Sequence, residues 1–455
     1  MTDPLDGQLI LVLGMARQGR ALARWLPTTG ARVLVSDSKT AEQLGVSPGD
    51  YPGVTLALGD QSEALLDGVD AVCISGGVPL ELPIVQAAQA KGIPLTNDAQ
   101  MFLERCPAPV IGITGSAGKT TTTTLTAEIV KRAGYRTWVG GNIGEVLLDV
   151  LPIIRATDRV VMELSSFQLD LMTASPDVAA VLNITPNHLD RHGTMDAYTR
   201  AKANILRHQH EKSNVAVLGR DDAGSRALAD AVNGKLIWFS AQEIVADGAF
   251  MAGERLVLAG RCSPDRKPHV VGERAEILLR GDHNVLNVLA ACAITGAMAV
   301  RPDVMMSAVR DFKGVAHRLE IVRVVGGVTW VNDSIATAPE RVIAALNSFS
   351  EPIVLLLGGR DKKLPWNSMM KLALSKCRAI VTFGEAAGIV MKAAKKAHGA
   401  KKVTRVETLD EAVAAAKHAA QPGDVVLLSP GATSYDAYVD FAARGEHFRA
   451  LVNDM

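Results

Sequence analysis

The chain has 455 residues, of which 48% are hydrophobic and 21% are charged. Its 48 basic and 48 acidic residues give a formal net charge of zero, so neither nucleic acid nor an anionic membrane is expected as a partner. The length suits about three domains of roughly 150 residues each.

Cysteine usage and apolar runs indicate the compartment. The five cysteines are scattered without a Cys-x-x-Cys pair, which argues against a disulfide framework or a zinc site. Residues 1–6 are acidic and lack the basic region of a signal peptide. The longest apolar segment, 285–300, contains Asn287, Thr295 and Gly296 and is shorter than the ~20 residues of a membrane span. We therefore expect a soluble, cytoplasmic protein in which this segment is a buried helix.

Short β-branched runs alternate with alanine-rich amphipathic stretches along the whole chain. This alternation predicts an α/β protein with largely parallel sheets. The first run, 9–13, is followed by Gly14-Met15-Ala16-Arg17-Gln18-Gly19, and a helix is expected over 20–26. Further strands are expected at 32–36, 71–75, 160–163, 178–183, 353–357, 379–383 and 425–429.

Residues near the first strand ends resemble a nucleotide site. The hexapeptide 14–19 is nearly the Gly-x-Gly-x-x-Gly fingerprint, with Ala16 at the second glycine, and Asp37 ends the next strand. A second glycine turn, Ser75-Gly76-Gly77, follows another strand, and both strand ends would face one crevice. NAD, another nucleotide and a purely structural turn all stay open, although Ala16 weakens NAD because that glycine lets the backbone approach a pyrophosphate.

A phosphate-binding loop follows the apolar run 109–113. It reads Thr114-Gly115-Ser116-Ala117-Gly118-Lys119-Thr120-Thr121-Thr122 and leads into a helical pattern. In such a loop the backbone N–H groups and the helix N-terminus bind phosphate oxygens. Lys119 would lie along the β- and γ-phosphates, and the Thr120 hydroxyl would be a ligand of Mg²⁺. The strict pattern has glycine where this chain has Ile113, so the loop is a compact variant.

Further polar clusters follow the loop. They are Gly140-Gly141-Asn142-Ile143-Gly144, Glu163-Leu164-Ser165-Ser166-Phe167-Gln168-Leu169 and Asn183-Ile184-Thr185-Pro186-Asn187-His188-Leu189-Asp190-Arg191-His192. Glu163, at a strand end, is placed to complete a Mg²⁺ site, although a carboxylate that caps a helix is the alternative. His188 is a candidate metal contact or a buried structural histidine. Lys202 alone would be taken for an ordinary lysine on a helix surface.

Together these motifs resemble those of the Mur ligases, the ATP-dependent amino-acid-adding enzymes of peptidoglycan synthesis. The motif sequences are most similar to those of the D-glutamate-adding branch, and the resemblance covers essentially the whole chain. It implies a Rossmann-like domain at 1–108 that binds a UDP substrate and a central P-loop ATPase-like domain at 109–313. A third, Rossmann-like α/β domain at 314–455 would bind the incoming amino acid and close over ATP.

The resemblance also implies the site residues and the cofactors ATP and Mg²⁺. Lys119, Glu163, His188 and Lys202 would be catalytic, and Thr120, Glu163, His188 and Lys202, the last as a carbamate, would hold Mg²⁺. ATP would contact Gly115, Ser116, Ala117, Gly118, Lys119, Thr120, Thr121, Asn284, Arg318 and Asp333. The UDP substrate would contact Met15, Ala16, Asp37, Ser38, Ser75, Gly77, Asn142, Ser165 and His188. The amino acid would contact Thr337, Lys362, Ser434 and Phe441.

The chain departs from the family motif at Ile335. The family usually reads Asn-Asp-Ser-Lys-Ala-Thr, whereas this chain has Ile335 in place of the lysine. A cation near the ATP-binding face is therefore missing at this position, although the flanking Ala336 and Thr337 match.

The resemblance implies an ATP-dependent ligase that adds D-glutamate to UDP-N-acetylmuramoyl-L-alanine through an acyl-phosphate intermediate, and we expect a monomer. Two other classes stay open. A P-loop NTPase that switches a partner would leave the 183–192 cluster unused. A nicotinamide oxidoreductase would explain only the first domain. The folate-polyglutamating ligases share the phosphate loop, but the nucleotide-like N-terminal domain argues against them.

Overall fold

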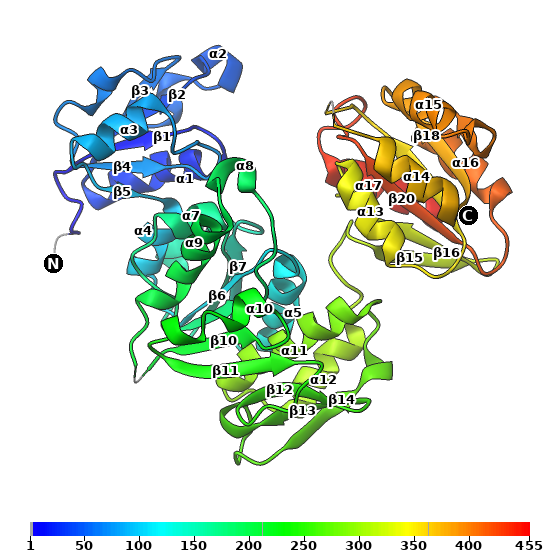
Figure 1. The fold of residues 1–455 in the computed structure, drawn as a ribbon. Coiled ribbons are helices and arrows are strands. Elements are labelled where there is room, and N and C mark those ends of the chain that lie inside the picture. The colour runs from blue at the N-terminus through cyan, green and yellow to red at the C-terminus, as the bar shows by residue number, and fades with distance from the viewer. Residues whose placement is uncertain (1–2, 212, 363) are drawn as a thin grey trace. The chain divides into compact units, whose positions relative to one another are not determined.

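The computed structural model describes residues 3–211, 213–362 and 364–455. The chain divides into two compact units, Met1–Leu278 with Asp282–Asp311 and Leu279–Gly281 with Phe312–Met455. Two sheets lie in the first unit and one in the second, and helices pack on each of them (Figure 1). The α/β class expected from the sequence is confirmed.

The first sheet is entirely parallel, with the strand order β3-β2-β1-β4-β5. Its strands are β1 (Leu9–Leu13), β2 (Arg32–Asp37), β3 (Val54–Leu58), β4 (Ala71–Ile74) and β5 (Leu95–Thr96). The helices are α1 (Arg17–Trp25), α2 (Ala41–Leu44), α3 (Pro83–Ala90) and α4 (Asp98–Arg105). Helix α1 begins three residues earlier than expected, so Arg17 is its first residue.

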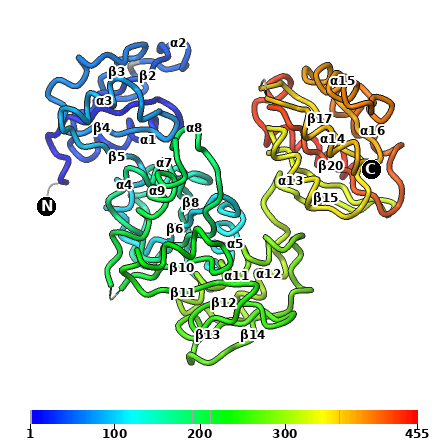
Figure 2. The backbone as a smooth tube through the Cα atoms, in the orientation of Figure 1, coloured from blue at the N-terminus to red at the C-terminus, as the bar shows by residue number. Residues whose placement is uncertain are grey.

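The second sheet has the strand order β14-β13-β12-β11-β10-β9-β6-β8-β7. The strands from β7 to β12 are parallel, and they are β6 (Val110–Thr114), β7 (Thr137–Gly141), β8 (Arg159–Glu163), β9 (Val178–Val181), β10 (Val215–Gly219), β11 (Lys235–Ser240) and β12 (Gly248–Ala252). Strands β13 (Arg255–Ala259) and β14 (His269–Glu273) extend the sheet beyond β12 as antiparallel hairpins (Figure 2). The sequence analysis did not predict these hairpins.

Helices pack on both the parallel and the antiparallel part of the second sheet. They are α5 (Lys119–Arg132), α6 (Leu147–Val150), α7 (Ser166–Asp170), α8 (Leu189–His192), α9 (Met195–Arg207), α10 (Ala223–Arg226), α11 (Asp282–Ala297) and α12 (Pro302–Asp311). The apolar segment predicted at 285–300 is largely α11, most of whose side chains are buried. Among the described helices, none has the length and apolar character to cross a membrane.

One apolar core joins the two sheets of the first unit. Trp25 and Phe102 from the N-terminal part belong to the same buried cluster as Leu147, Leu148 and Met162 from the central part. This continuity explains why residues of both sheets form a single compact unit. The domain boundaries at 108 and 313 stay predictions.

The second unit contains the third sheet, with the order β15-β16-β20-β17-β18-β19. Its strands are β15 (Glu320–Val325), β16 (Val328–Asn332), β17 (Ile353–Gly358), β18 (Cys377–Phe383), β19 (Val403–Arg405) and β20 (Val425–Gly431). Only β15 is antiparallel to its neighbour, and Gly326 and Gly327 in the β15–β16 turn both have positive φ (57° and 77°). Such a turn matches the twist of the two strands and favours glycine.

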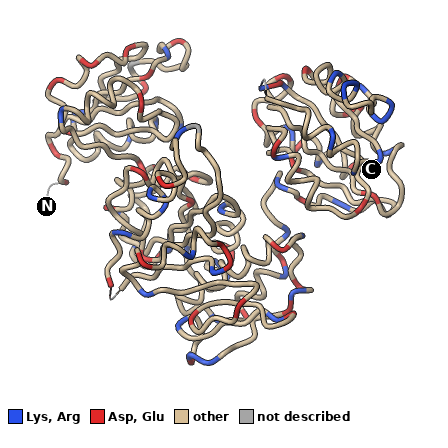
Figure 3. The backbone as a smooth tube through the Cα atoms, in the orientation of Figure 1, with Lys and Arg blue, Asp and Glu red and all other residues tan. Residues whose placement is uncertain are grey.

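Helices cover the third sheet as α13 (Pro339–Asn347), α14 (Asn367–Lys376), α15 (Ala387–Lys396), α16 (Leu409–Ala419) and α17 (Phe441–Asn453). Short 3-10 turns join other elements at Leu26–Thr29, Pro48–Asp50, Glu63–Leu66, Leu151–Ile153, Ala229–Ala231, Gly260–Cys262, Arg274–Glu276 and Ala400–Lys402. Basic and acidic residues are interspersed over both units, in keeping with the zero net charge (Figure 3).

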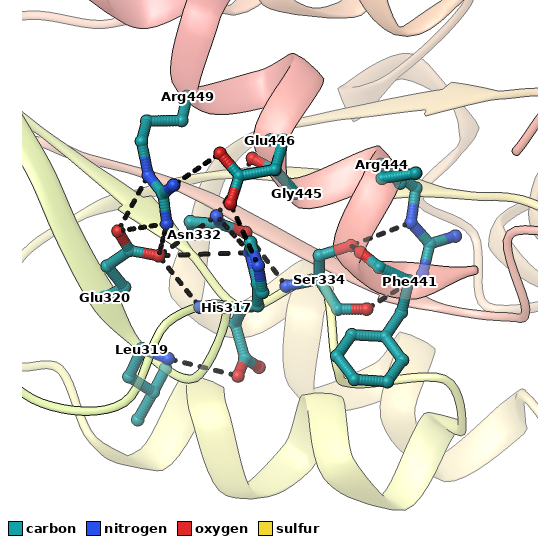
Figure 4. A network of polar contacts seen from close by, with 12 residues as sticks. His317, Leu319, Glu320, Asn332, Ser334, Phe441, Arg444, Gly445, Glu446 and Arg449 are labelled. Atoms are coloured by element: carbon teal, nitrogen blue, oxygen red, sulfur yellow. Dashed lines mark hydrogen bonds and ion pairs between the residues drawn. The ribbon is translucent and has the colours of Figure 1, made fainter. Parts of the chain in front are cut away.

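A buried arginine ties the strand ends of the second unit together. Arg444 of α17 is 0% exposed, and its guanidinium donates to the Ser334 Oγ (3.0 Å) and carbonyl (2.9 Å) after β16 (Figure 4). It also donates to the carbonyls of Ala432 after β20 (3.2 Å) and Gly358 in β17 (3.4 Å). Burial lowers the pKa of the Arg444 guanidinium to about 10, so this cation stays protonated at neutral pH.

Replacement of Arg444 by methionine tests this role. Arg444→Met leaves the carbonyls of Ser334, Gly358 and Ala432 buried without their donor, so we expect the free energy of unfolding to fall by about 3 kcal/mol. Urea unfolding followed by circular dichroism measures the change. Arg405→Met is the control, because Arg405 is 54% exposed in its 3.6 Å pair with Glu407 and should contribute less than about 0.5 kcal/mol. Equal unfolding midpoints for the two variants would contradict this role.

Candidate active site

The phosphate loop lies between β6 and α5, as the sequence predicts. Gly118, directly before the helix, has φ +83°, and a Cβ there would lie 2.3 Å from Oδ1 of Asn287. Both the backbone conformation and the close neighbour therefore require glycine at this position. The Lys119 ammonium donates to the carbonyl of Gly115 at 2.8 Å and so lies over its own loop.

Asn183, which follows β9, holds the loop in place. Its Oδ1 accepts from the N–H of Ala117 at 2.8 Å, and its Nδ2 donates to the Ala117 carbonyl at 3.1 Å. The Ser116 hydroxyl donates to the carbonyl of Thr185 at 2.9 Å, which adds a second tie to the same segment. Asn183 stood in a motif singled out from the sequence, yet no role was predicted for it.

The structure brings Thr120, Glu163 and Asn142 together. Glu163, 2% exposed at the end of β8, accepts from the Thr120 hydroxyl at 2.8 Å through Oε2 and from the Asn142 amide at 2.9 Å through Oε1. A hydroxyl and a carboxylate beside a phosphate loop are the oxygen ligands that Mg²⁺ prefers. Within the described residues no group of three or more His, Cys, Asp and Glu side chains could hold a metal. Phosphate oxygens and water would therefore have to complete the coordination, as is usual for Mg²⁺.

Lys202 is a buried residue of this site. It is 1% exposed on α9, and its Nζ donates to the Gly115 carbonyl at 3.0 Å and to the Thr114 hydroxyl at 3.2 Å. Burial lowers the pKa of the Lys202 ammonium well below its usual range, the charge of Lys119 acts in the same direction, and Glu163 opposes both. The interpretation as a surface lysine is thus excluded.

His188 lies at the start of α8 in a strained backbone conformation. It is exposed, with φ +52°, and its ring meets the Phe167 ring edge-on at a centroid distance of 5.2 Å. Phe167 also stacks on His192 at 5.2 Å and contacts the Arg191 guanidinium at 4.1 Å. The alternative of a buried structural histidine is therefore wrong for His188. Its contact with a metal stays a prediction.

A cavity of about 350 Å³ adjoins the phosphate loop. Its walls include Gly118 of the loop, and among the others are Asn183, Asp221, Phe239, His283 and Asn287. The predicted Asn284 side chain instead accepts a hydrogen bond from Nδ2 of Asn287 at 2.9 Å. Asn287 is thus the residue that the sequence analysis missed here, although it lies one helical turn beyond Asn284.

Residues predicted to bind the UDP substrate gather at the carboxyl ends of β1, β2 and β4. Asp37 accepts from the backbone N–H groups of Met15 (2.7 Å) and Lys39 (2.9 Å), so its carboxylate joins two strand ends. The side chain of Met15 is buried in the core. Ser75 is 2% exposed and lines a cavity of about 130 Å³. The exposed predicted residues at these strand ends are Ala16, Ser38 and Gly77.

Two further predicted substrate residues belong to neighbouring loops. Asn142 makes a second contact with Glu163, because its N–H donates to the Glu163 carbonyl at 2.8 Å. The Ser165 hydroxyl accepts from the N–H of Gln168 at 3.2 Å and thereby caps α7. Ser165 thus has a local structural role, and its contact with substrate stays a prediction.

In the second unit a polar network supports the backbone around Arg318. His317 and Leu319 both have positive φ (63° and 46°), and Asn332 contacts Nδ1 of His317 at 3.1 Å (Figure 4). The Leu319 N–H donates to Asp333 at 3.2 Å, and this carboxyl also accepts from the Ser429 hydroxyl at 2.8 Å. Burial raises the pKa of Asp333 to about 7, against these two donors.

The residues predicted to bind the amino acid lie at the same strand ends. Lys362 donates to the Thr337 hydroxyl at 3.2 Å, and burial together with the charge of Arg341 lowers the pKa of this lysine. Phe441 begins α17, and its carbonyl accepts from the Ser334 hydroxyl at 2.7 Å. Ser434 is 2% exposed. Beside Ile335, whose carbonyl accepts from Arg341 at 3.2 Å, a guanidinium is present even though the family lysine is absent.

Two solved structures of ligases share this fold. UDP-N-acetylmuramate-alanine ligase MurC from Thermotoga maritima aligns with a TM-score of 0.58 at 18% identity, over 98% of this chain and 99% of that one. MurF from Acinetobacter baumannii aligns with a TM-score of 0.57 at 19% identity, over 98% of this chain and 93% of that one. At these identities the likeness shows the fold alone.

Sequence comparisons extend the likeness to the whole chain. An enzyme of Symbiobacterium thermophilum named UDP-N-acetylmuramoylalanine–D-glutamate ligase is 40% identical over 447 residues, 97% of each chain. The enzyme of the same name from Clostridium botulinum strain 657 is 37% identical over 460 residues, 100% of this chain and 98% of that one.

Three family models match consecutive parts of the chain. The Mur ligase MurD-like N-terminal domain matches residues 8–97, the Mur ligase middle domain 113–295, and the Mur ligase glutamate ligase domain 317–432. The middle domain contains the phosphate loop, Glu163 and Lys202, which the structure brings together. With this order of domains and relatives of 37–40% identity over its full length, the chain belongs to the Mur ligase family.

Proposed function

We propose that the chain is an ATP-dependent, ADP-forming ligase that adds D-glutamate to UDP-N-acetylmuramoyl-L-alanine in peptidoglycan precursor synthesis. Its relatives with this activity in their names match it from end to end. The arrangement that carries the proposal is the Glu163 carboxylate, which binds both Thr120 of the phosphate loop and Asn142 of the predicted substrate loop. We also propose that the reaction is cytoplasmic and that the enzyme acts as a monomer.

In this proposal the phosphate loop binds the triphosphate of ATP. The loop N–H groups and the N-terminus of α5 would surround the phosphate oxygens. Lys119 would exchange its contact with the Gly115 carbonyl for the β- and γ-phosphates. The cavity of about 350 Å³ beside Gly118 is large enough for a nucleoside, with Asn183 and Asn287 among its polar walls.

Thr120 and Glu163 would hold Mg²⁺, together with His188 and a carbamate on Lys202. Bound there, Mg²⁺ would neutralise negative charge on the transferring phosphoryl group. Glu163 is oriented by its hydrogen bonds from Thr120 and Asn142, so its ligand geometry is prepared before binding. These contacts support the assignment of Glu163 as a ligand over the alternative of a helix-capping carboxylate.

Lys202 has the surroundings that carbamate formation needs. Because burial and Lys119 lower its pKa, the side chain is neutral at a lower pH than an ordinary lysine. A neutral amine attacks the carbon of CO₂ and loses a proton, which leaves an anionic carbamate. This group would replace a cation by oxygen ligands beside the phosphate loop, where hard anionic oxygens suit Mg²⁺.

The reaction would proceed in two steps. The alanine carboxylate of the UDP substrate attacks the γ-phosphate of ATP, giving an acyl phosphate and ADP. The amine of glutamate then attacks the acyl carbon, and inorganic phosphate leaves from the tetrahedral intermediate as the amide forms. Lys119 and the loop N–H groups would stabilise the charge that develops in the first step.

The second unit would supply the amino-acid contacts. Lys362 and Thr337, which are hydrogen-bonded to each other, would bind a carboxylate of glutamate. Ser434 and Phe441 would form the rest of this site, and Arg318 and Asp333 would contact ATP. Arg341, which lies beside Ile335 and influences Lys362, would provide the positive charge that the missing family lysine would otherwise give.

Phosphate release tests the proposed reaction directly. With ATP, Mg²⁺ and UDP-N-acetylmuramoyl-L-alanine, D-glutamate should support release of phosphate, whereas L-glutamate and other D-amino acids should give only background. Omission of the UDP substrate is the matched control. ATP consumption that is independent of either the carboxylate or the amine substrate would reject the ligase assignment and favour a P-loop NTPase.

Lys202→Ala should lower kcat by about 100-fold or more, because it removes the charged carbamate that would be positioned near the reacting phosphates. Arg200→Ala on the exposed side of the same helix is the control and should retain activity. Native mass spectrometry should show a 44 Da adduct on the parent protein that Lys202→Ala lacks. Full activity of Lys202→Ala, without an adduct on the parent, would remove the carbamate from the mechanism.

Gly118→Ala should weaken binding of an ATP analogue by at least about tenfold, because its Cβ would meet Asn287 and strain the loop. Calorimetry measures the dissociation constant. Gly134→Ala, after the other end of α5, is the matched control: Gly134 has a similar φ of +92° but no atom within 4 Å of the added Cβ. Equal affinities in the two variants would show that the Gly118 conformation is unrelated to ATP.

A further inference from the structure

Arg17 connects the loop after β1 with the loop after β7. As the first residue of α1, it donates from Nη1 to the carbonyl of Gly144 at 3.0 Å and from Nη2 to the carbonyl of Gly141 at 3.4 Å. Both contacts lie within the first compact unit, and they join its two sheets at their carboxyl ends. None of the roles assigned above involves Arg17.

The position of Arg17 is electrostatically unfavourable for a cation. The N-terminus of a helix carries partial positive charge, and the first turn of α1 has no acidic residue. Negative charge near this guanidinium comes from the Asp98 carboxyl of α4, whose pKa the charge of Arg17 lowers against the effect of burial, and from the two carbonyl oxygens of the other sheet. An arginine here is therefore explained by groups outside its own helix, and its hydrogen bonds go to the loop that it reaches.

The loop that Arg17 reaches is tightly folded against β7 and β8. Gly141 and Gly144 have φ of +92° and +68°, and a Cβ on them would lie 2.4 Å from the Glu163 carbonyl and 2.6 Å from the Val139 carbonyl, respectively. Asn142, between these glycines, binds Glu163 through both its N–H (2.8 Å) and its side-chain amide (2.9 Å). Arg17 thus holds the two ends of the segment that orients Glu163.

We propose that Arg17 is a positioning residue that couples the UDP-substrate crevice to the Mg²⁺ site. By fixing the carbonyls of Gly141 and Gly144, it keeps Asn142 on the Glu163 carboxylate and this carboxylate on Thr120. Arg17 is exposed at the loop that carries the predicted UDP contacts Met15 and Ala16, so the same side chain borders both sites. This inference rests on the proposed ligase function.

The chain offers a matched control on the same helix. Arg24 of α1 also reaches the central part, where its guanidinium binds the Asp149 carboxylate of α6 at 2.7 Å. This exposed pair joins the same two parts of the first unit without touching the segment 141–144. A general effect of weaker packing between the two parts would appear in both variants, whereas a positioning effect would appear only at Arg17.

Hydrogen exchange tests the structural part without substrate or metal. In Arg17→Ala, the amides of Asn142 and Glu145, which bind the carbonyls of Glu163 (2.8 Å) and Val139 (2.9 Å), should exchange about tenfold faster or more. Arg24→Ala should leave both rates unchanged, and circular dichroism should show that both variants are folded. Unchanged exchange in Arg17→Ala would overturn the proposal, whatever reaction the enzyme catalyses.

Binding and kinetics test the coupling. Arg17→Ala should raise both the calorimetric dissociation constant for UDP-N-acetylmuramoyl-L-alanine and the Mg²⁺ concentration for half-maximal activity, each by about fivefold or more. Arg17→Lys should recover part of both effects because it keeps the charge but loses the two-pronged geometry. A change in substrate affinity alone would make Arg17 a simple substrate contact and reject the coupling. If the parent enzyme neither binds this substrate nor uses ATP, the proposed function fails instead.

Discussion

The central constraint in this molecule is a carboxylate removed from water at the end of a strand. Glu163 is 2% exposed, and a buried charge is tolerated only when polar partners replace its water. Its partners come from two loops, through Thr120 after β6 and Asn142 after β7. These loops and the three strands must therefore keep a fixed register, and the neighbouring Lys202 lies in the same protected volume.

Much of this arrangement was predictable because it follows from local patterns. Apolar runs located those parallel strands for which a range was predicted to within about two residues, whereas β3, β5, β7, β10, β11, β12 and β19 were not predicted. The order of β-branched strand, glycine turn and helix located the phosphate loop. The hairpins β12 to β14 were missed although their strands are consecutive in the chain, and β12 pairs with β13 across a two-residue turn that contains Gly253 with φ +62°. The burial of Lys202 could not be predicted from the neighbouring sequence, because it results from the packing of α9 on β6.

Side chains that hold other side chains were the hardest to foresee. Asn183 and Asn287 act on the loop and the adjoining cavity, yet an asparagine after a strand or within a helix has many ordinary uses. In the second unit, Arg444 and Asp333 are buried ionisable groups whose partners are carbonyls, two hydroxyls and a backbone N–H. Such partners carry no sequence signature, because any residue offers a backbone carbonyl.

The continuous apolar core of the first unit has a consequence for ligand affinity. Since Trp25, Phe102 and Met162 belong to one packed cluster, apolar contacts hold the first two sheets together in one compact unit. A ligand held between the carboxyl ends of these sheets would meet walls that are already assembled. The ligand would then not have to order two lobes, so its binding free energy would not include that entropy cost. Its association rate would depend on desolvation and diffusion instead.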